Sequence, residues 1–179
     1  MTQLQTQRYS RRARWLHWVM AALVVLAYCL ILSRTQFTRG SDYRVLVVQS
    51  HYWTGILLLA LAFFRLAERR RHTPPAITPP LQGAVRTLAT LSHYLMYGFL
   101  FVQPVLGLLT VLVEKGSLPI LFTDAAIPWP LPTSGRTAEY FEDLHKLFAR
   151  LFYYVAGVHV LAALWHHFIR KDNTLKRMR

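Results

Sequence analysis

Four histidines lie inside apolar segments of this 179-residue chain. They are His17, His51, His145 and His159. His145 and His159 are 14 residues apart on one segment. On an α-helix this spacing is close to four turns, so both rings point the same way, about 21 Å apart along the helix axis. Two imidazoles at two depths on one helix are suited to two haem groups, with the other two histidines as the opposite axial ligands.

The composition indicates a membrane protein. Hydrophobic residues make up 54% of the chain and charged residues only 16%, which is low for a soluble domain. The net charge of +13 raises the possibility of nucleic-acid binding. However, the basic residues cluster between apolar runs, as in membrane proteins with a basic cytoplasmic face. Cys29 is the one cysteine and no C-x-x-C-H motif occurs, which excludes covalently attached c-type haem.

Four charge-free apolar stretches are long enough to cross a bilayer, which needs roughly 17–25 residues. Backbone groups in lipid must satisfy their own hydrogen bonds, so these stretches should be helices. The sequence therefore predicts one all-α domain over residues 1–179. It is an integral membrane four-helix bundle of up-down-up-down topology. The expected spans are about 13–33, 44–66, 86–113 and 141–170.

The linkers between the spans differ in character. Residues 72–80 contain four prolines and should form a surface turn without helix. The longest linker runs from about 114 to 143, and its part from 118 to 132 is apolar, broken by prolines and contains Trp129. This part is expected to lie at the membrane interface like a lid.

Charge predicts the orientation in the membrane. The segments before the first span, between the second and third, and after the fourth carry fourteen basic residues, whereas the opposite segments carry seven. Only Glu68 and Asp172 are acidic on the more basic side. The positive-inside rule therefore predicts that both termini are cytoplasmic.

Orientation and spacing together pair the histidines by depth. His17 and His159 should lie near the inner surface, and His51 and His145 near the outer surface. The alternative is that these histidines are buried polar groups that bond between helices. His93 lies in the third span at the inner depth. It is an alternative to His17 as the inner ligand, or a partner for a haem propionate or a neighbouring helix.

Several motifs resemble a known family. They are Tyr9-Ser10 with His17-Trp18, His51 with Gly55, Pro104-Val105-x-Gly107, His145-x13-His159 and the ending His166-His167-x3-Lys171-Asp172-Asn173-Thr174-Leu175. Together they resemble the bacterial di-haem cytochrome b561 family, above all its superoxide oxidase members. The resemblance covers nearly the whole chain. It implies a multi-pass protein of the bacterial inner membrane with two b haems. The ligand positions of the family match His17, His51, His145 and His159.

The resemblance also implies an activity. Such an oxidoreductase would oxidise periplasmic superoxide to oxygen and reduce ubiquinone, with no protein partner required. The alternative is a haem b electron-transfer subunit that links a separate dehydrogenase or hydrogenase to the quinone pool. A non-redox membrane protein such as a channel is a third possibility, which four buried histidines without an intramembrane carboxylate disfavour.

Position and family likeness suggest further site residues. His166, Trp18 and Lys171 are candidates for a quinone site at the inner rim, although His166 is equally explained as an interfacial histidine. The outer surface has a small net charge, so any steering of superoxide must be local. Candidate steering residues are Lys146 and Arg150, one turn apart, with Arg44 seven residues before His51. The alternative is that these three are solvated charges that pair with lipid phosphates, Glu142 or Asp143.

Overall fold

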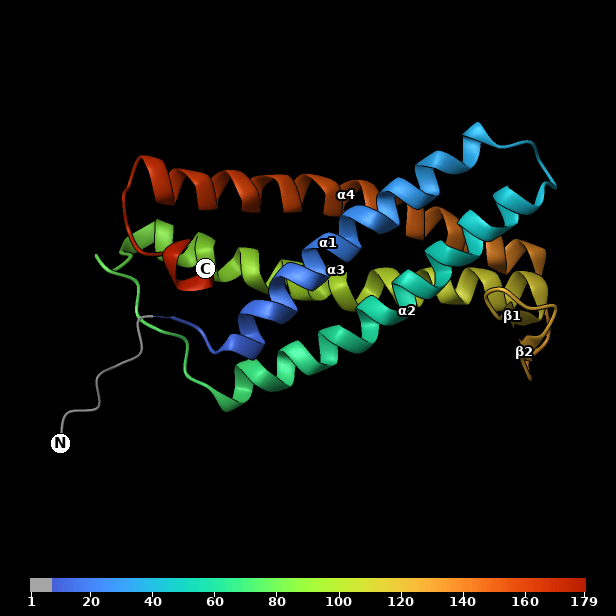
Figure 1. The fold of residues 1–179 in the computed structure, drawn as a ribbon, viewed down its shortest axis with the longest axis horizontal. Helices are drawn as coiled ribbons and strands as arrows, with labels where there is room; N and C mark the ends of the chain where they lie inside the picture. Colours follow the sequence, from blue (N-terminus) through green and yellow to red (C-terminus); the bar gives the residue numbers. More distant parts are fainter. Residues whose placement is uncertain (1–7) are drawn as a thin grey trace.

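The computed structural model describes residues 8–179 and contains four long helices (Figure 1). They are α1 (Arg11–Ser33), α2 (Asp42–Arg71), α3 (Gly83–Lys115) and α4 (Gly135–Phe168). The short elements are the 3-10 helices η1 (Arg34–Gln36) and η2 (Lys176–Met178) and the strands β1 (Ser117–Pro119) and β2 (Ala126–Pro128). Each long helix is long and apolar enough to cross a membrane. The predicted four-helix membrane bundle is confirmed.

Serine side chains cap the N-termini of three of the four long helices. Ser10, Ser41 and Ser134 accept hydrogen bonds from the backbone N–H groups of Ala13, Arg44 and Thr137 at the starts of α1, α2 and α4. Each bond satisfies one of the N–H groups that the first turn of a helix leaves free. Because Ser134 provides such a cap, α4 starts at Gly135, earlier than the expected start near residue 141. Likewise α2 continues to Arg71, past the expected end near 66, because arginine is a good helix former and the prolines follow only at 74 and 75.

The helices form two antiparallel pairs. α1 packs along α2, α3 packs along α4, and α2 also contacts α3. In Figure 1 the α1–α2 pair runs obliquely across the α3–α4 pair. A cluster of Met20 from α1 and Leu58 and Ala62 from α2 packs against Leu100 and Phe101 of α3. This cluster holds α1, α2 and α3 together near the middle of the bundle.

Many large apolar side chains point outward instead of into this core. Phe63 and Phe64 on α2, Val105 on α3, and Tyr153 and Val160 on α4 are all exposed. On a soluble monomer an apolar surface of this extent would be unstable against association. In a bilayer the surrounding hydrocarbon solvates it, and helices then associate through packing and hydrogen bonds.

The two ends of the bundle differ. At the end where α1 begins and α4 finishes, the backbone N–H of Tyr9 donates to the Arg177 carbonyl at 3.1 Å. Here the described chain therefore starts and finishes, as an up-down-up-down topology requires (Figure 1). This end carries the fourteen basic residues counted above, and we call it the basic end. The opposite end carries β1 and β2, and we call it the hairpin end.

The expected lid between α3 and α4 contains regular structure that the sequence analysis missed. β1 and β2 pair antiparallel, with Leu118 opposite Ile127. Leu118 is buried and packs with Val111 and Leu112 of α3. The indole N–H of Trp53 on α2 donates to the Pro119 carbonyl at 3.0 Å. The hairpin is therefore fastened to α2 and α3, and it covers their ends.

Leu118→Ala should loosen this hairpin. Removing a buried leucine side chain leaves a cavity and costs about 2–3 kcal/mol where the site is close to the surface. The midpoint of thermal unfolding in detergent should fall, and the 117–128 segment should become more sensitive to protease. Ile127→Ala is the matched control, since Ile127 faces Leu118 across the hairpin but is exposed. Equal effects of the two substitutions would show that Leu118 does not fasten the hairpin.

Candidate functional site

One histidine pair lies at the hairpin end. The ring centres of His51 on α2 and His145 on α4 are 6.1 Å apart, with the ring planes at 85°. Nδ1 of His51 is 2.9 Å from the Ala27 carbonyl of α1, and Nδ1 of His145 is 3.0 Å from the Gln103 carbonyl of α3. A carbonyl only accepts, so in both rings Nδ1 is the donor. Nε2 is then the acceptor nitrogen of each ring and the one that could bind a ligand, although His145 Nε2 here faces the Gln103 side-chain amide.

α3 packs closely against His145. The Gln103 side-chain amide donates to the His145 carbonyl at 3.0 Å and lies 3.3 Å from His145 Nε2. A Cβ atom placed on Gly107 would lie only 2.8 Å from Cε1 of the His145 ring. Only glycine therefore lets the ring approach the helix backbone this closely. The pocket between the two rings has a volume of about 30 Å³, close to that of one water molecule.

Three histidines meet at the basic end. The ring centre of His159 on α4 is 6.4 Å from that of His17 on α1 and 5.8 Å from that of His93 on α3. Nδ1 of His93 is 2.6 Å from the Ala89 carbonyl of its own helix, so this nitrogen is the donor. His159 therefore has two possible partners, and geometry alone does not favour His17 over His93.

These three rings line a cavity of about 1190 Å³, which we call the basic-end cavity. All four long helices contribute to its walls, together with the loop that follows α2 and the segment 170–179, which follows α4. Leu88, Leu95 and Val158 supply apolar wall, and Arg65 and Arg69 supply positive charge. The volume exceeds the roughly 300–1,000 Å³ of pockets that bind drug-sized ligands.

The structure brings two of the three quinone candidates to this cavity. His166 and Trp18 both line it. The Trp18 indole N–H donates to the Met178 carbonyl at 2.8 Å, and His166 Nδ1 is 2.5 Å from Asp172 Oδ2. Lys171 is not among the lining residues and is exposed. It adopts a left-handed backbone conformation with φ of 57°, just beyond the end of α4.

The three superoxide candidates make different contacts at the hairpin end. Lys146 Nζ forms an ion pair with Glu142 at 2.9 Å. Arg44 donates to the carbonyls of Arg34 and Phe37 and so holds the α1–α2 loop. Arg150 is exposed, and no ion pair joins it within residues 8–179. Among the described residues the three side chains therefore share no hydrogen-bond or ion-pair partner.

Two buried carboxylates at the basic end were not selected in the sequence analysis. Glu68 accepts a hydrogen bond of 2.5 Å from the Ser10 hydroxyl, and it lines the basic-end cavity. Asp172 is buried beside His166. A signal was present, because these are the only two acids in the segments that carry the fourteen basic residues. Buried carboxylates usually have partners, and here their partners include the hydroxyl and imidazole groups that surround the cavity.

Four long apolar helices with histidine rings that face one another between them define a membrane-spanning four-helix bundle. The family model described as prokaryotic cytochrome b561 matches residues 8–179. The chain belongs to the prokaryotic cytochrome b561 family. It is therefore a multi-pass protein of the bacterial inner membrane, in a family of haem b proteins that transfer electrons.

Named relatives match nearly the full chain. Cytochrome b561 homolog 1 of Escherichia coli (strain K12) is 32% identical over 171 residues, which cover 96% of both chains. The probable superoxide oxidase CybB of Yersinia pestis is 31% identical over 172 residues, again 96% of both. Cytochrome b561 homolog 2 of Escherichia coli (strain K12) is 28% identical over 172 residues, 96% of this chain and 91% of the relative.

Gly107→Ala should displace the His145 ring, because the added methyl group would lie within van der Waals contact distance of Cε1. We expect the haem content per chain to fall, as measured by the pyridine haemochrome assay. Gly98→Ala is the matched control on the same helix, since nothing lies within 4 Å of a Cβ placed there. A full haem content in Gly107→Ala would show that the position of His145 does not affect haem binding.

Proposed function

We propose that the chain holds two b haems, one at each end of the bundle. His51 and His145 would be the axial ligands at the hairpin end, and His17 and His159 those at the basic end. Two imidazoles that bind one metal ion from opposite sides, with bonds of about 2 Å, have ring centres about 6 Å apart. The observed 6.1 and 6.4 Å support this assignment.

A haem at the hairpin end would need the side chains around the two rings to move apart, because the pocket there has a volume of only about 30 Å³. Gly55 lines the hairpin-end pocket, and a Cβ placed there meets nothing within 4 Å. His93 remains the alternative to His17, because its ring is also near His159.

The orientation belongs to the same proposal. The basic end would face the cytoplasm and the hairpin end the periplasm, as the excess of basic residues supports. The two haems would supply one-electron transfer between these ends. Because an imidazole pair occupies both axial positions of the iron, such a site favours electron transfer over oxygen binding.

The basic-end cavity would bind ubiquinone, and its size and lining carry this part of the proposal. It contains the His17–His159 pair, apolar walls for an isoprenoid tail, and the polar groups of His166 and Trp18 for the quinone head. Lys171 is the weaker candidate, since it does not line the cavity. A cavity of about 1190 Å³ leaves room for more than one ligand.

The electron donor would be superoxide at the hairpin end. Two superoxide anions release two electrons and become two oxygen molecules, and a quinone takes up two electrons and two protons to become a quinol. The similarity to the probable superoxide oxidase CybB of Yersinia pestis supports this donor. The alternative is a haem b subunit that takes electrons from a separate dehydrogenase or hydrogenase. A protein partner is possible in either case and is required only in the second.

Removal of single ligands should separate the two haems. His51→Ala or His145→Ala should lose the hairpin-end haem and keep the other, and His17→Ala or His159→Ala should do the reverse. The pyridine haemochrome assay should give two haems per wild-type chain and one per variant, and low-temperature absorption spectra should show which one is lost. One haem in the wild type would contradict the proposal. If His17→Ala keeps both while His93→Ala loses one, His93 is the inner ligand.

Purified protein without any partner should reduce a ubiquinone analogue when superoxide is generated in the assay. Replacement of Lys146 and Arg150 by glutamine should lower this rate by roughly twofold to tenfold at low salt, because the charges would steer the anion. The difference should shrink as salt screens them. The haem spectra should not change.

Lys176→Gln is the matched control, because it removes one exposed cation from the basic end. A rate that is independent of salt, with no effect of the double substitution, would remove the steering role. Absence of haem reduction by superoxide would remove the donor assignment and leave the electron-transfer subunit as the function.

A further inference from the structure

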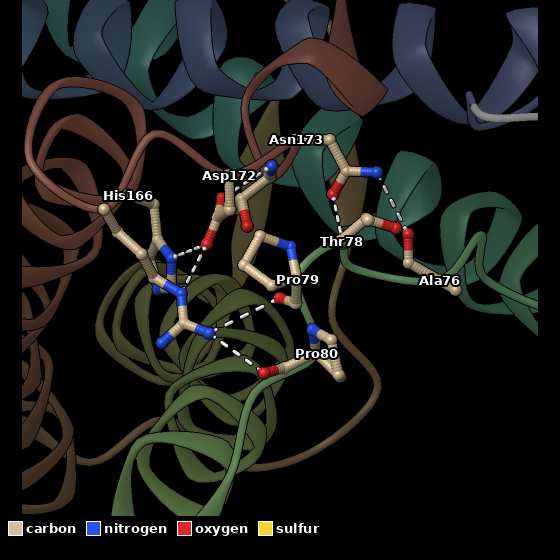
Figure 2. A network of polar contacts seen from close by, with 9 residues as sticks. Ala76, Thr78, Pro79, Pro80, His166, Asp172 and Asn173 are labelled. Atoms are coloured by element: carbon tan, nitrogen blue, oxygen red, sulfur yellow. Dashed lines mark hydrogen bonds and ion pairs between the residues drawn. The ribbon is translucent and has the colours of Figure 1, made fainter.

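A histidine and an aspartate form a buried pair beside the basic-end cavity, and Figure 2 shows the contact between them. Nδ1 of His166, near the end of α4, is 2.5 Å from Oδ2 of Asp172. The Asp172 side chain is fully buried and that of His166 is 9% exposed. His166 lines the cavity, whereas Asp172 is not one of its lining residues. With Nδ1 held by the carboxylate, Nε2 is the ring nitrogen left for a ligand in the cavity.

Asp172 is held in its ionised form. Burial alone would raise the pKa of its carboxyl group, but the hydrogen bonds from Thr174 and His166 outweigh burial, and the pKa is lowered. The backbone N–H of Thr174 donates to Oδ1 at 2.8 Å. The negative charge of Asp172 is therefore fixed beside the imidazole of His166 at neutral pH.

The neighbouring residues fix the position of this carboxylate. Arg170 Nε is 3.1 Å from Asp172 Oδ2, and the same guanidinium donates to the Pro80 carbonyl at 2.9 Å. Asn173 accepts from the Thr78 backbone N–H at 2.9 Å and donates to the Ala76 carbonyl at 3.2 Å. Figure 2 shows these bonds joining segment 170–179 to the loop after α2. The carboxylate itself is held by Arg170, Thr174 and His166, whereas the Asn173 bonds only tie the segment to the loop.

The other charges around the cavity are mainly positive. They include Arg14 of α1, Arg65 and Arg69 of α2, and Arg177 of segment 170–179, with the rings of His93 and His159 from α3 and α4. Glu68 is the one carboxylate among the described lining residues, and it bonds to Ser10. These cations oppose a positive charge on His166, and the contact with Asp172 favours it.

We infer that His166 donates a proton to the quinone as it is reduced, and that Asp172 is the positioning residue which balances the doubly protonated ring. The inference rests on the proposed quinone site. As the quinone gains electrons that originate from superoxide, the Nε2–H bond breaks and an O–H bond forms on the quinone oxygen. His166 becomes neutral and keeps its Nδ1–H bond to Asp172. It regains a proton from cytoplasmic water, and a second transfer completes the quinol.

The test measures how fast a ubiquinone analogue reoxidises the dithionite-reduced full-length protein between pH 5.5 and 9. In the wild type the rate should fall with rising pH in one single-proton transition. In Asp172→Asn the amide keeps the shape but not the charge, so the transition should move down by about one pH unit or more. Above both transitions the variant should be roughly tenfold slower or more, and the two rates should converge as the pH falls.

Asn173→Ala is the matched control, because it removes the bonds to Thr78 and Ala76 and leaves the His166–Asp172 contact. Its transition should stay at the wild-type pH. The inference is overturned if Asp172→Asn slows the reaction equally at every pH, if it changes nothing, or if Asn173→Ala shifts the transition as much.

His166→Gln provides an independent test, in case Asp172→Asn does not fold with its haem. This variant should lose the transition altogether, and a transition at the wild-type pH would overturn the inference. If the quinone fails to reoxidise even the wild-type protein, the proposed quinone site is wrong and this inference is lost with it. Reoxidation of the wild-type protein therefore distinguishes failure of the proposed quinone site from failure of the inference about His166 and Asp172.

Discussion

Hydrocarbon offers no hydrogen-bond partners, and this constraint governs where each polar side chain of the bundle can lie. The imidazoles of His51 and His145 bond to backbone carbonyls of neighbouring helices. The Tyr28 hydroxyl donates to the Ala149 carbonyl, and Arg65 donates to the Ala13 carbonyl. The same bonds thus satisfy buried polar groups, connect helices and set the direction of each ring. The need to pair buried polar groups in the membrane therefore determines which nitrogen of His51 and of His145 donates and which one accepts.

The facing rings lie across the seam between the two helix pairs. α4 packs along α3, yet His145 and His159 face rings on α2 and α1. The basic-end cavity occupies the same seam. A cofactor that binds there would join the two halves of the bundle, so its binding free energy would add to the stability of the fold. The site and the fold are therefore energetically coupled.

Much of the architecture follows from sequence alone, because four long apolar stretches allow few alternatives in a membrane. Depth and topology also place His51 next to His145 and His17 next to His159, as the structure does. Sequence could not distinguish His17 from His93, since both reach His159 and the difference depends on side-chain placement. The ligand roles themselves stay a prediction.

Local details were harder to foresee. The β1–β2 hairpin depends on burial of Leu118 against α2 and α3, a long-range contact in a proline-rich segment that matches no local strand pattern. Lys171 does not line the cavity, and its backbone is left-handed at a position where no glycine marks the turn. By contrast, the pairing of Lys146 with Glu142 was visible as an i, i+4 spacing.

The way in which segment 170–179 closes the basic end has a consequence for how the protein is made. This segment follows all four membrane helices in the chain, so a ribosome synthesises it after them. Its contacts with Tyr9, Trp18 and the loop after α2 can form only then. The helices can therefore insert and associate before the contacts of segment 170–179 form at the basic-end cavity. A bulky cofactor would have access during this interval, and segment 170–179 would restrict that access once its contacts had formed.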